Sequence, residues 1–288
     1  MARRERTPEE LAAKRAAQRA LYQHLNQTVN RDPDPRVVQT RLRNMWDATP
    51  EQVKTLGRQW YPSVHDAAAK AAHSVGKDVR AGAGVVAAVS PGMDWENQNI
   101  HAFDDLDRFT PRDWRTIQES ARGKSRNEAA KAVVAGTSLS RASDDNLLKA
   151  HRIWNLGEDP DEVLDRTGAP KTNSFYHNIL EPHKDGLVTV DGRHADIITD
   201  GMRPWEMDRG ISSAQLKTGK PTRYEQYSQM TADAAHHLGV LPHELQAGLW
   251  EHVKLAERNY NPARKQGDTR RGQSYMERIS RQFGGSGL

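Results

Sequence analysis

The chain has 288 residues, of which 36% are hydrophobic and 28% are charged, and its formal net charge is +4. This length allows one large domain or two small ones with a buried core. The absence of cysteine excludes disulfides, thiolate nucleophiles and cysteine-held zinc or iron–sulfur clusters, while the mild basic excess permits a polyanionic partner without requiring one.

The first 79 residues are predicted to form an N-terminal helical extension. Thr7-Pro8-Glu9-Glu10 is a helix start signal, and it predicts a helix over residues 8–29. The prolines in the segment 31–35 end that helix. A second start signal at residues 49–52 opens a helix towards Trp60, and Pro62 is expected to restart a third helix that runs to residue 72.

Residues 80–258 are predicted to form the main domain. The apolar run at residues 82–90 has no second run to pair with as a strand, so it is expected to be a buried helix. Residues 104–125 are expected to be a loop with a short helix at 114–121. Further helices are predicted at residues 127–135, 144–154, 160–166, 171–180, 191–199, 224–238 and 242–259.

Two segments lack helical periodicity. Residues 201–221 are polar and contain glycine and proline, which indicates a long connecting loop. Residues 259–288 are rich in Lys and Arg and end in Gly-Gly-Ser-Gly-Leu, so they are expected to be a basic, disordered tail. No segment is typical of a strand, and the predicted fold class is therefore all-α.

The short turn Thr167-Gly168-Ala169-Pro170 lies between two predicted helices. Backbone N–H groups of such a turn, together with the N-terminus of the next helix, can hold a DNA phosphate without reading sequence. Pro170 suits the first helical position because its missing N–H costs nothing there.

Four segments together resemble the helix-hairpin-helix DNA glycosylase superfamily. Lys171-Thr172 matches the lysine at the end of the family's hairpin, and Val188-Thr-Val-Asp191 matches its aspartate motif. The run from Val85 to Ser90, followed by Asn99, is similar to the family's apolar helix and its asparagine. The segment 145–153 is similar to the helix that precedes the hairpin. The order of these segments agrees over residues 80–258.

The resemblance implies a DNA base-processing enzyme, most simply an N-glycosylase acting on a flipped-out damaged or modified base. Asp191 would be the essential carboxylate, and Lys171, if deprotonated by burial, would attack C1′ and give lyase activity. Expected nucleic-acid contacts are Thr167, Gly168, Ala169, Thr172, Arg193 and His194. The expected pocket residues are Trp95, Asn97, Gln98 and Asn99. DNA is the expected partner, with no metal, cofactor or membrane, in an intracellular location.

Departures from the family pattern leave alternatives open. The Gly168-Ala-Pro-Lys turn is shorter than the family's two-glycine turn, and His194 is shifted by one place after Asp191. Phage-encoded relatives that resemble this superfamily are thought to attach an amine or amino acid to an activated 5-hydroxymethyl pyrimidine in DNA, which is the alternative reaction. A third alternative is a non-catalytic DNA-binding accessory protein. Asp191 would then be a plain helix N-cap, and Lys171 a solvated phosphate contact.

Overall fold

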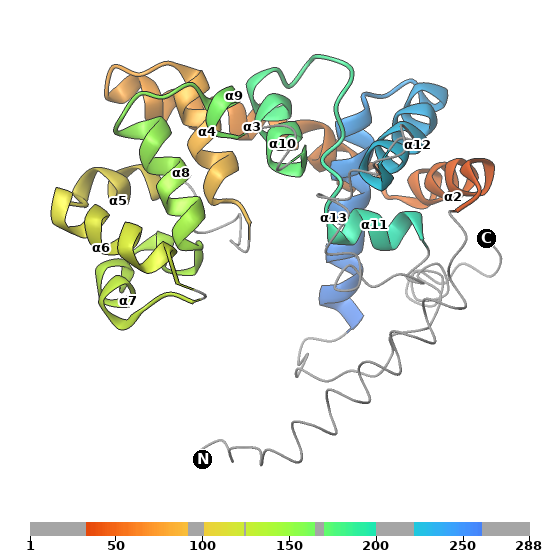
Figure 1. Cartoon of the computed structure of the whole chain (residues 1–288). Helices are drawn as coiled ribbons and strands as arrows, with labels where there is room; N and C mark the ends of the chain where they lie inside the picture. Colours follow the sequence, from red (N-terminus) through yellow and green to blue (C-terminus); the bar gives the residue numbers. More distant parts are fainter. Residues whose placement is uncertain (1–32, 92–100, 124, 165–169, 200–221, 261–288) are drawn as a thin grey trace, which may run out of the picture.

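The computed structural model describes residues 33–91, 101–123, 125–164, 170–199 and 222–260 (Figure 1). Within these ranges the secondary structure is helical, and no strand occurs among them, which confirms the predicted all-α class. The elements are α2 (Pro35–Ala48), α3 (Glu51–Ser74), α4 (Val79–Val89), α5 (Ala102–Arg108), α6 (Pro111–Ala121), α7 (Glu128–Val134), the 3-10 turn η1 (Ser138–Arg141), α8 (Asp144–Trp154), α9 (Pro160–Val163), α10 (Pro170–Leu180), α11 (Gly192–Ile198), α12 (Arg223–Leu238) and α13 (Pro242–Tyr260).

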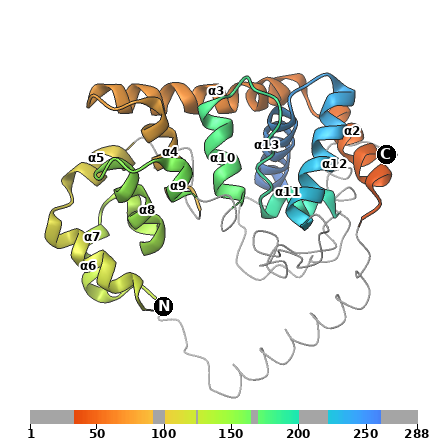
Figure 2. The same ribbon diagram turned by 45° about the horizontal axis from the view of Figure 1, so that its top comes forward.

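The helices form two lobes, each with its own hydrophobic core. The first lobe contains α4 to α10, and its core also takes in buried residues of α3. The second lobe contains α2, α11, α12 and α13, with the extended segment 188–190. Figure 2 shows α3 running along one side of the molecule across both lobes, and this helix packs against α13 of one lobe and α4 of the other. α3 is therefore the element that fixes the two lobes relative to each other.

α4 is the buried centre of the first lobe, as its apolar sequence predicts. Asp78 caps it by accepting a hydrogen bond from the Ala81 amide at 3.0 Å. The residues from Gly82 to Val89 are all buried. A Cβ at Gly82 would lie 2.4 Å from the Ala68 carbonyl oxygen, so glycine is required for α4 to approach α3 this closely.

α3 is one helix, whereas the sequence pattern predicted a break at Pro62. Proline removes one backbone hydrogen bond and usually costs about 3 kcal/mol inside a helix. Here the helix continues through Pro62 because residues on both sides of it, including Tyr61, Val64 and Ala68, are buried against other helices. Tertiary packing thus outweighs the local penalty.

Two further helix predictions need correction. Prolines 33 and 35 were expected only to end a helix, but Pro35 occupies the first position of α2 and Asp34 caps it by accepting from the Arg36 amide. The segment 104–125 was expected to be mostly loop, yet it holds parts of α5 and the whole of α6, which Thr110 and Asp113 start with a capping box. The predicted helix at residues 8–29, the loop 201–221 and most of the basic tail lie outside the described residues.

α2 and α3 pack into the two cores, a feature that the expected division of the chain at residue 80 does not include. The other predicted helices of the main domain occur within one to three residues of the expected bounds. The C-terminus of α12 is closed by Gly239 in the left-handed conformation, with φ of 67°.

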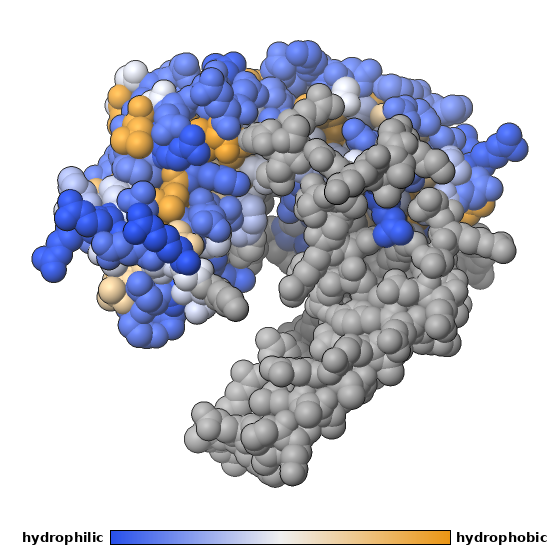
Figure 3. All heavy atoms as spheres, in the orientation of Figure 1, coloured by the Kyte–Doolittle hydropathy of each residue, from blue (hydrophilic) through white to orange (hydrophobic). Residues whose placement is uncertain are grey.

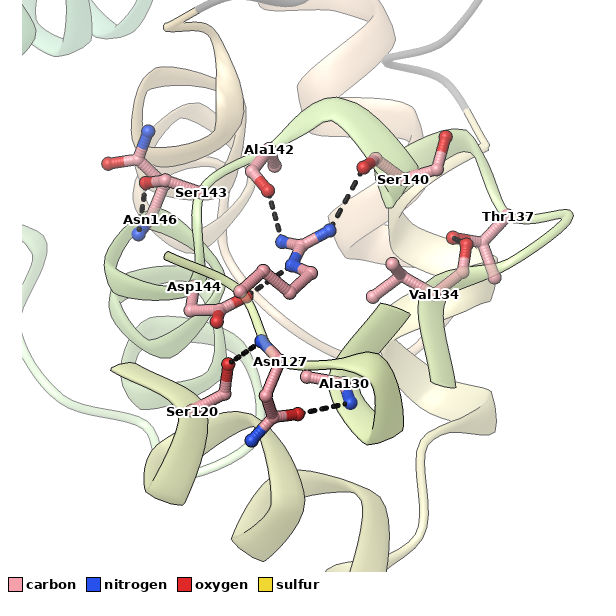
Figure 4. Close-up of polar contacts among 11 residues, drawn as sticks. Ser120, Asn127, Ala130, Val134, Thr137, Ser140, Ala142, Ser143, Asp144 and Asn146 are labelled. Carbon is pink, nitrogen blue, oxygen red and sulfur yellow. Dashed lines mark hydrogen bonds and ion pairs between the residues drawn. The ribbon is translucent and has the colours of Figure 1, made fainter. Parts of the chain in front are cut away.

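Arg126 ties together the short elements at the far end of the first lobe. Figure 4 labels its partners Ser140, Ala142 and Asp144. The Nε of Arg126 donates to Asp144 at 2.5 Å, and its two terminal nitrogens donate to the carbonyl oxygens of Ser140 and Ala142. Next to it, the Asn127 amide donates to the Ser120 hydroxyl at 2.9 Å. These contacts join α6, α7, η1 and the start of α8.

Candidate functional site

A pocket of about 220 Å³ lies where the two lobes meet. It is formed by α3, the end of α4, α10, the extended segment before α11, α11 itself and α13. Its lining residues are Trp60, Tyr61, Ser90, Lys171, Phe175, Thr189, Asp191, Arg193, Gln246, Ala247 and Trp250. The pocket therefore contains both residues that the sequence singled out for catalysis.

Lys171 and Asp191 reach this pocket from two different helices. Lys171 is in the first turn of α10, and Asp191 is the N-cap of α11, where its Oδ1 accepts a hydrogen bond from the His194 amide at 2.8 Å. Both side chains are half-buried. Among the residues that the structure describes, they form no ion pair with each other or with a third group, so the second carboxylate oxygen and the amine remain available to a ligand.

Aromatic side chains form the apolar walls of the pocket. Trp60 and Tyr61 lie edge to face, with ring centroids 4.8 Å apart, and Phe175 lies 5.7 Å from Trp60 and 5.9 Å from Tyr61. Trp250 of α13 adds a further ring. Such surfaces favour a flat, aromatic ligand, because rings pack well on one another in stacked or edge-on arrangements.

Two cations lie on Trp250 at the α13 side of the pocket. The guanidinium carbon of Arg193 is 5.1 Å from the ring centre, and the Lys254 ammonium is 4.9 Å from it. A cation over an aromatic face is attracted by the ring's negative face. Lys254 also pairs with Glu251 at 3.4 Å and lies outside the lining, so the charged groups among the lining residues are the cations Lys171 and Arg193 and the anion Asp191.

A buried chain of polar side chains lines the inner wall. The Tyr61 hydroxyl lies 3.0 Å from the Thr189 hydroxyl and 3.1 Å from Gln246 Oε1, and Asn178 donates to Thr189 at 3.1 Å. Burial is the main cause that raises the pKa of Tyr61 above its ordinary value. The phenol therefore stays protonated and acts as a hydrogen-bond donor.

Three of the residues predicted to bind nucleic acid are described by the structure, and they lie in different parts of the fold. Arg193 lines the pocket, and Thr172 is half-buried in the first turn of α10, next to Lys171. His194 does not fit the prediction: it is fully buried, and its Nε2 lies 2.7 Å from the Thr231 hydroxyl in the core of the second lobe. Its position excludes the predicted contact with a DNA backbone in this fold.

Seven predicted site residues lie outside the described residues. They are the hairpin residues Thr167, Gly168 and Ala169 and the expected pocket residues Trp95, Asn97, Gln98 and Asn99.

Sequence reasoning missed most of the pocket walls. Phe175 is one helical turn from Lys171, and Thr189 is two residues before Asp191 in an extended segment, so both share a face with a predicted residue and could have been found. Gln246 and Trp250 share a face of α13 in the same way. Trp60 and Tyr61 are more than 100 residues from Lys171 along the chain, and no local signal connects them with it.

A larger pocket of about 510 Å³ lies at the far end of the first lobe, between α6, α7, η1 and the start of α8. Its central cation, Arg126, is already bonded to Asp144 and to two backbone carbonyls. Lys131, a second cation of the lining, is paired with Glu128 at 2.6 Å. The smaller pocket, in which polar groups remain available between aromatic walls, is therefore the candidate site.

Other surfaces of the described residues offer little chemistry. On the face seen in Figure 3, hydrophilic side chains predominate and the hydrophobic ones form small patches, mainly on the first lobe. Within the described ranges no group of three or more His, Asp or Glu side chains could hold a metal ion. None of the helices described there combines the length and the apolar character needed to cross a membrane.

Comparison with known proteins places the chain in a family without giving it an activity. The chain belongs to the family described as "Family of unknown function (DUF7178)", whose model matches residues 26–258. This range covers both lobes and every residue of the candidate site. No curated protein and no solved structure matches the chain.

Proposed function

We propose that this protein is a DNA base-processing enzyme, an N-glycosylase with lyase activity that acts on a flipped-out base, with a fold similar to that of the helix-hairpin-helix DNA glycosylases. The observation that carries the proposal is the meeting of Lys171 and Asp191 in one aromatic-walled pocket. The two residues are a predicted pair, twenty positions apart along the chain. Their convergence is what a shared catalytic role requires.

The size and walls of the pocket suit a single nucleobase. Its volume of about 220 Å³ is below the roughly 300–1,000 Å³ of pockets that hold drug-sized ligands. A base leaving the duplex loses stacking and pairing worth a few kcal/mol, which stacking on Trp60, Phe175 and Trp250 would offset. An aromatic slot of this size is thus a suitable receptor for one extruded base.

The proposed reaction begins at the sugar of the extruded nucleotide. As the N-glycosidic bond breaks, its electron pair leaves with the base, which takes up a proton, and positive charge develops on the sugar. The Asp191 carboxylate stabilises that charge. The ammonium of Lys171 gives one proton to the departing base, and the resulting amine forms a bond to C1′. A second proton passes to O4′ as the C1′–O4′ bond breaks and the ring opens, giving a protonated Schiff base from which loss of a C2′ proton eliminates the 3′ phosphate.

DNA binding beside this site would use the two cations of the pocket lining. Arg193 and Lys171 are close to where the sugar and its phosphates would lie. Contacts of this kind position a nucleic acid without reading its sequence, and their strength falls as salt rises.

The test is base release from a panel of duplexes, each with one uracil, 5-hydroxymethyluracil, oxidised guanine or alkylated adenine, followed by mass spectrometry of bases and nucleosides. Wild-type protein is expected to release a base from at least one duplex. Asp191→Asn should lower that rate by on the order of 100-fold or more, because the stabilising charge is lost. Asparagine caps a helix about as well as aspartate does, so the fold of α11 is retained.

The same products separate the alternatives. A base that gains mass and stays attached to its sugar indicates the transferase reaction on an activated 5-hydroxymethyl pyrimidine. Tight binding with no product in either wild type or Asp191→Asn indicates an accessory protein. Either result contradicts the glycosylase proposal.

A further inference from the structure

Gln246 presents a buried hydrogen-bond donor to the pocket. It lies on α13, it is 5% exposed, and it forms part of the pocket lining. Its Oε1 accepts from the Tyr61 hydroxyl at 3.1 Å. Its amide nitrogen has no partner within the described part of the chain. Because the side chain is held at Oε1 and lines the pocket, its amide nitrogen is placed where a ligand can accept from it.

The orientation of this amide is set by its neighbours. Asn178 donates its amide hydrogen to Thr189 Oγ1, which lies 3.0 Å from the Tyr61 hydroxyl. A phenol has one hydrogen and the Gln246 carbonyl oxygen can only accept, so Thr189 supplies the hydrogen for the bond between the two hydroxyls. The chain therefore runs in one direction and ends on Oε1 of Gln246.

A reversed Gln246 amide would reverse the direction of this chain. Oε1 would then face the pocket, the amide nitrogen would donate to the Tyr61 oxygen, and the Tyr61 hydrogen would turn to Thr189 Oγ1, 3.0 Å away. All four side chains are buried, with exposed fractions of 2% for Tyr61, 3% for Asn178, 4% for Thr189 and 5% for Gln246. The chain is thus shielded from water, and in the structure it has the arrangement in which Oε1 of Gln246 faces Tyr61.

We propose that Gln246 is a specificity-determining residue of this pocket. It selects a base with a keto oxygen, such as uracil or a 5-substituted uracil, over a base with an amino group at the same position, such as cytosine. The inference rests on the proposed function, because it assigns the base that the same pocket holds. A keto oxygen accepts from the Gln246 amide. An exocyclic amino group would place two donors against each other and leave both unsatisfied.

The test measures binding to two duplexes that differ at one position, which holds uracil or cytosine opposite a tetrahydrofuran abasic analogue. Neither base is paired, so the cost of extrusion is nearly the same. Fluorescence anisotropy gives the two dissociation constants. Wild-type protein is expected to prefer uracil by about tenfold, the value of one buried hydrogen bond gained or lost.

Three variants examine the cause of the preference. Gln246→Met keeps the volume and removes the donor, so the preference should fall to about one. Gln246→Glu replaces the donor by an acceptor, which still receives the Tyr61 hydrogen, and it should favour cytosine. Tyr61→Phe releases the amide to rotate, so binding of the uracil duplex should weaken and selectivity should fall. Gln118→Met changes an exposed glutamine of α6 and is the matched control, expected to behave as wild type.

The outcomes distinguish the two proposals. Base release together with an unchanged uracil preference in both Gln246 variants overturns the role of Gln246 and leaves the proposed function standing. A wild-type protein that binds neither duplex and releases no base overturns both. A preference lost in Gln246→Met and reversed in Gln246→Glu, with the Gln118 variant unchanged, supports the inference.

Discussion

Asp191 has a structural and a proposed chemical role at the same time. One of its carboxylate oxygens caps α11 through the His194 amide, which agrees with the reading of this residue as an N-cap. The carboxylate also lines the pocket beside Lys171. Capping holds the side chain in one position, and a fixed charge stabilises a developing positive charge without reorganisation. The two roles are therefore compatible.

His194 is expected to make the folded state sensitive to acid. Burial is the main cause that lowers the pKa of His194 to about 4, from an ordinary value of 6.5, while the nearby Asp191 carboxylate acts in the opposite direction. The folded state thus favours the neutral ring. Its contribution is fully present above pH 6.5 and is lost as the pH falls towards 4. Burial also lowers the pKa of His252 to about 4, which adds in the same direction.

The expected loss from His194 between pH 7.5 and 5.0 is about 2 kcal/mol of unfolding free energy. Urea denaturation at the two pH values measures it. His194→Gln removes this titration and should reduce the pH-dependent loss by that amount, whatever its effect at pH 7.5. His73→Gln, at an exposed position of α3, should leave the loss unchanged. An equal loss in wild type and His194→Gln would contradict the assignment.

At the scale of single elements, the contact of α3 with α13 shapes the pocket. A Cβ added to Gly57 would lie 2.4 Å from the Gly248 Cα, so the two backbones touch at this point. Trp60 and Tyr61 follow Gly57 on α3, and Gln246 and Trp250 flank Gly248 on α13. The glycine pair therefore determines how closely the opposing walls of the pocket approach.

Gly57→Ala is expected to push α3 and α13 apart, because backbone atoms cannot rotate away from the new methyl group. Overpacking of this kind costs about 1–3 kcal/mol, which exceeds the gain in helix propensity of about 1 kcal/mol. Urea denaturation should show the lower stability, and any base release should fall with it. Ser63→Ala, at an exposed position of the same helix, is the control. A Gly57→Ala protein as stable as wild type would show that this contact is not tight.

Helices with several agreeing local signals could be predicted from the sequence. α4, α8, α12 and α13 combine an apolar face with start or stop residues, and they occur where expected. The helices that were predicted wrongly at Pro35 and Pro62 have a common cause, because a proline can end a helix, begin one or lie inside one. Pro35 begins α2 behind its Asp34 cap, which is a local signal present in the sequence. Pro62 lies inside α3 because burial of neighbouring side chains outweighs the local rule, and those tertiary contacts are not displayed by the sequence.

The candidate site was predictable only in its local part. Lys171 and Asp191 follow from the motif and its spacing, and both line the pocket. His194 was misplaced, although its spacing from Ile197 and Ile198 is that of a buried helical face, and this could have indicated its position in the core. Trp60, Tyr61 and Gln246 come from elements distant in sequence, so only the fold brings them to Lys171.

At the scale of the whole molecule, the candidate site belongs to neither lobe alone. Lys171 and Phe175 come from α10 of the first lobe, whereas Arg193 and Trp250 come from the second, and α3 joins the two (Figure 1). An arrangement of this kind is common for ligand sites, which often lie between structural units. A base held there would contact both lobes at once.

Borohydride trapping on a duplex with one abasic site tests the central claim most directly, because it depends on Lys171 and not on the identity of the target base. Wild-type protein and Lys184→Ala, which changes an exposed lysine just after α10, are expected to form a covalent adduct that denaturing electrophoresis detects. Lys171→Ala should form none. The absence of an adduct with wild-type protein, or an equal yield with Lys171→Ala, would contradict the account.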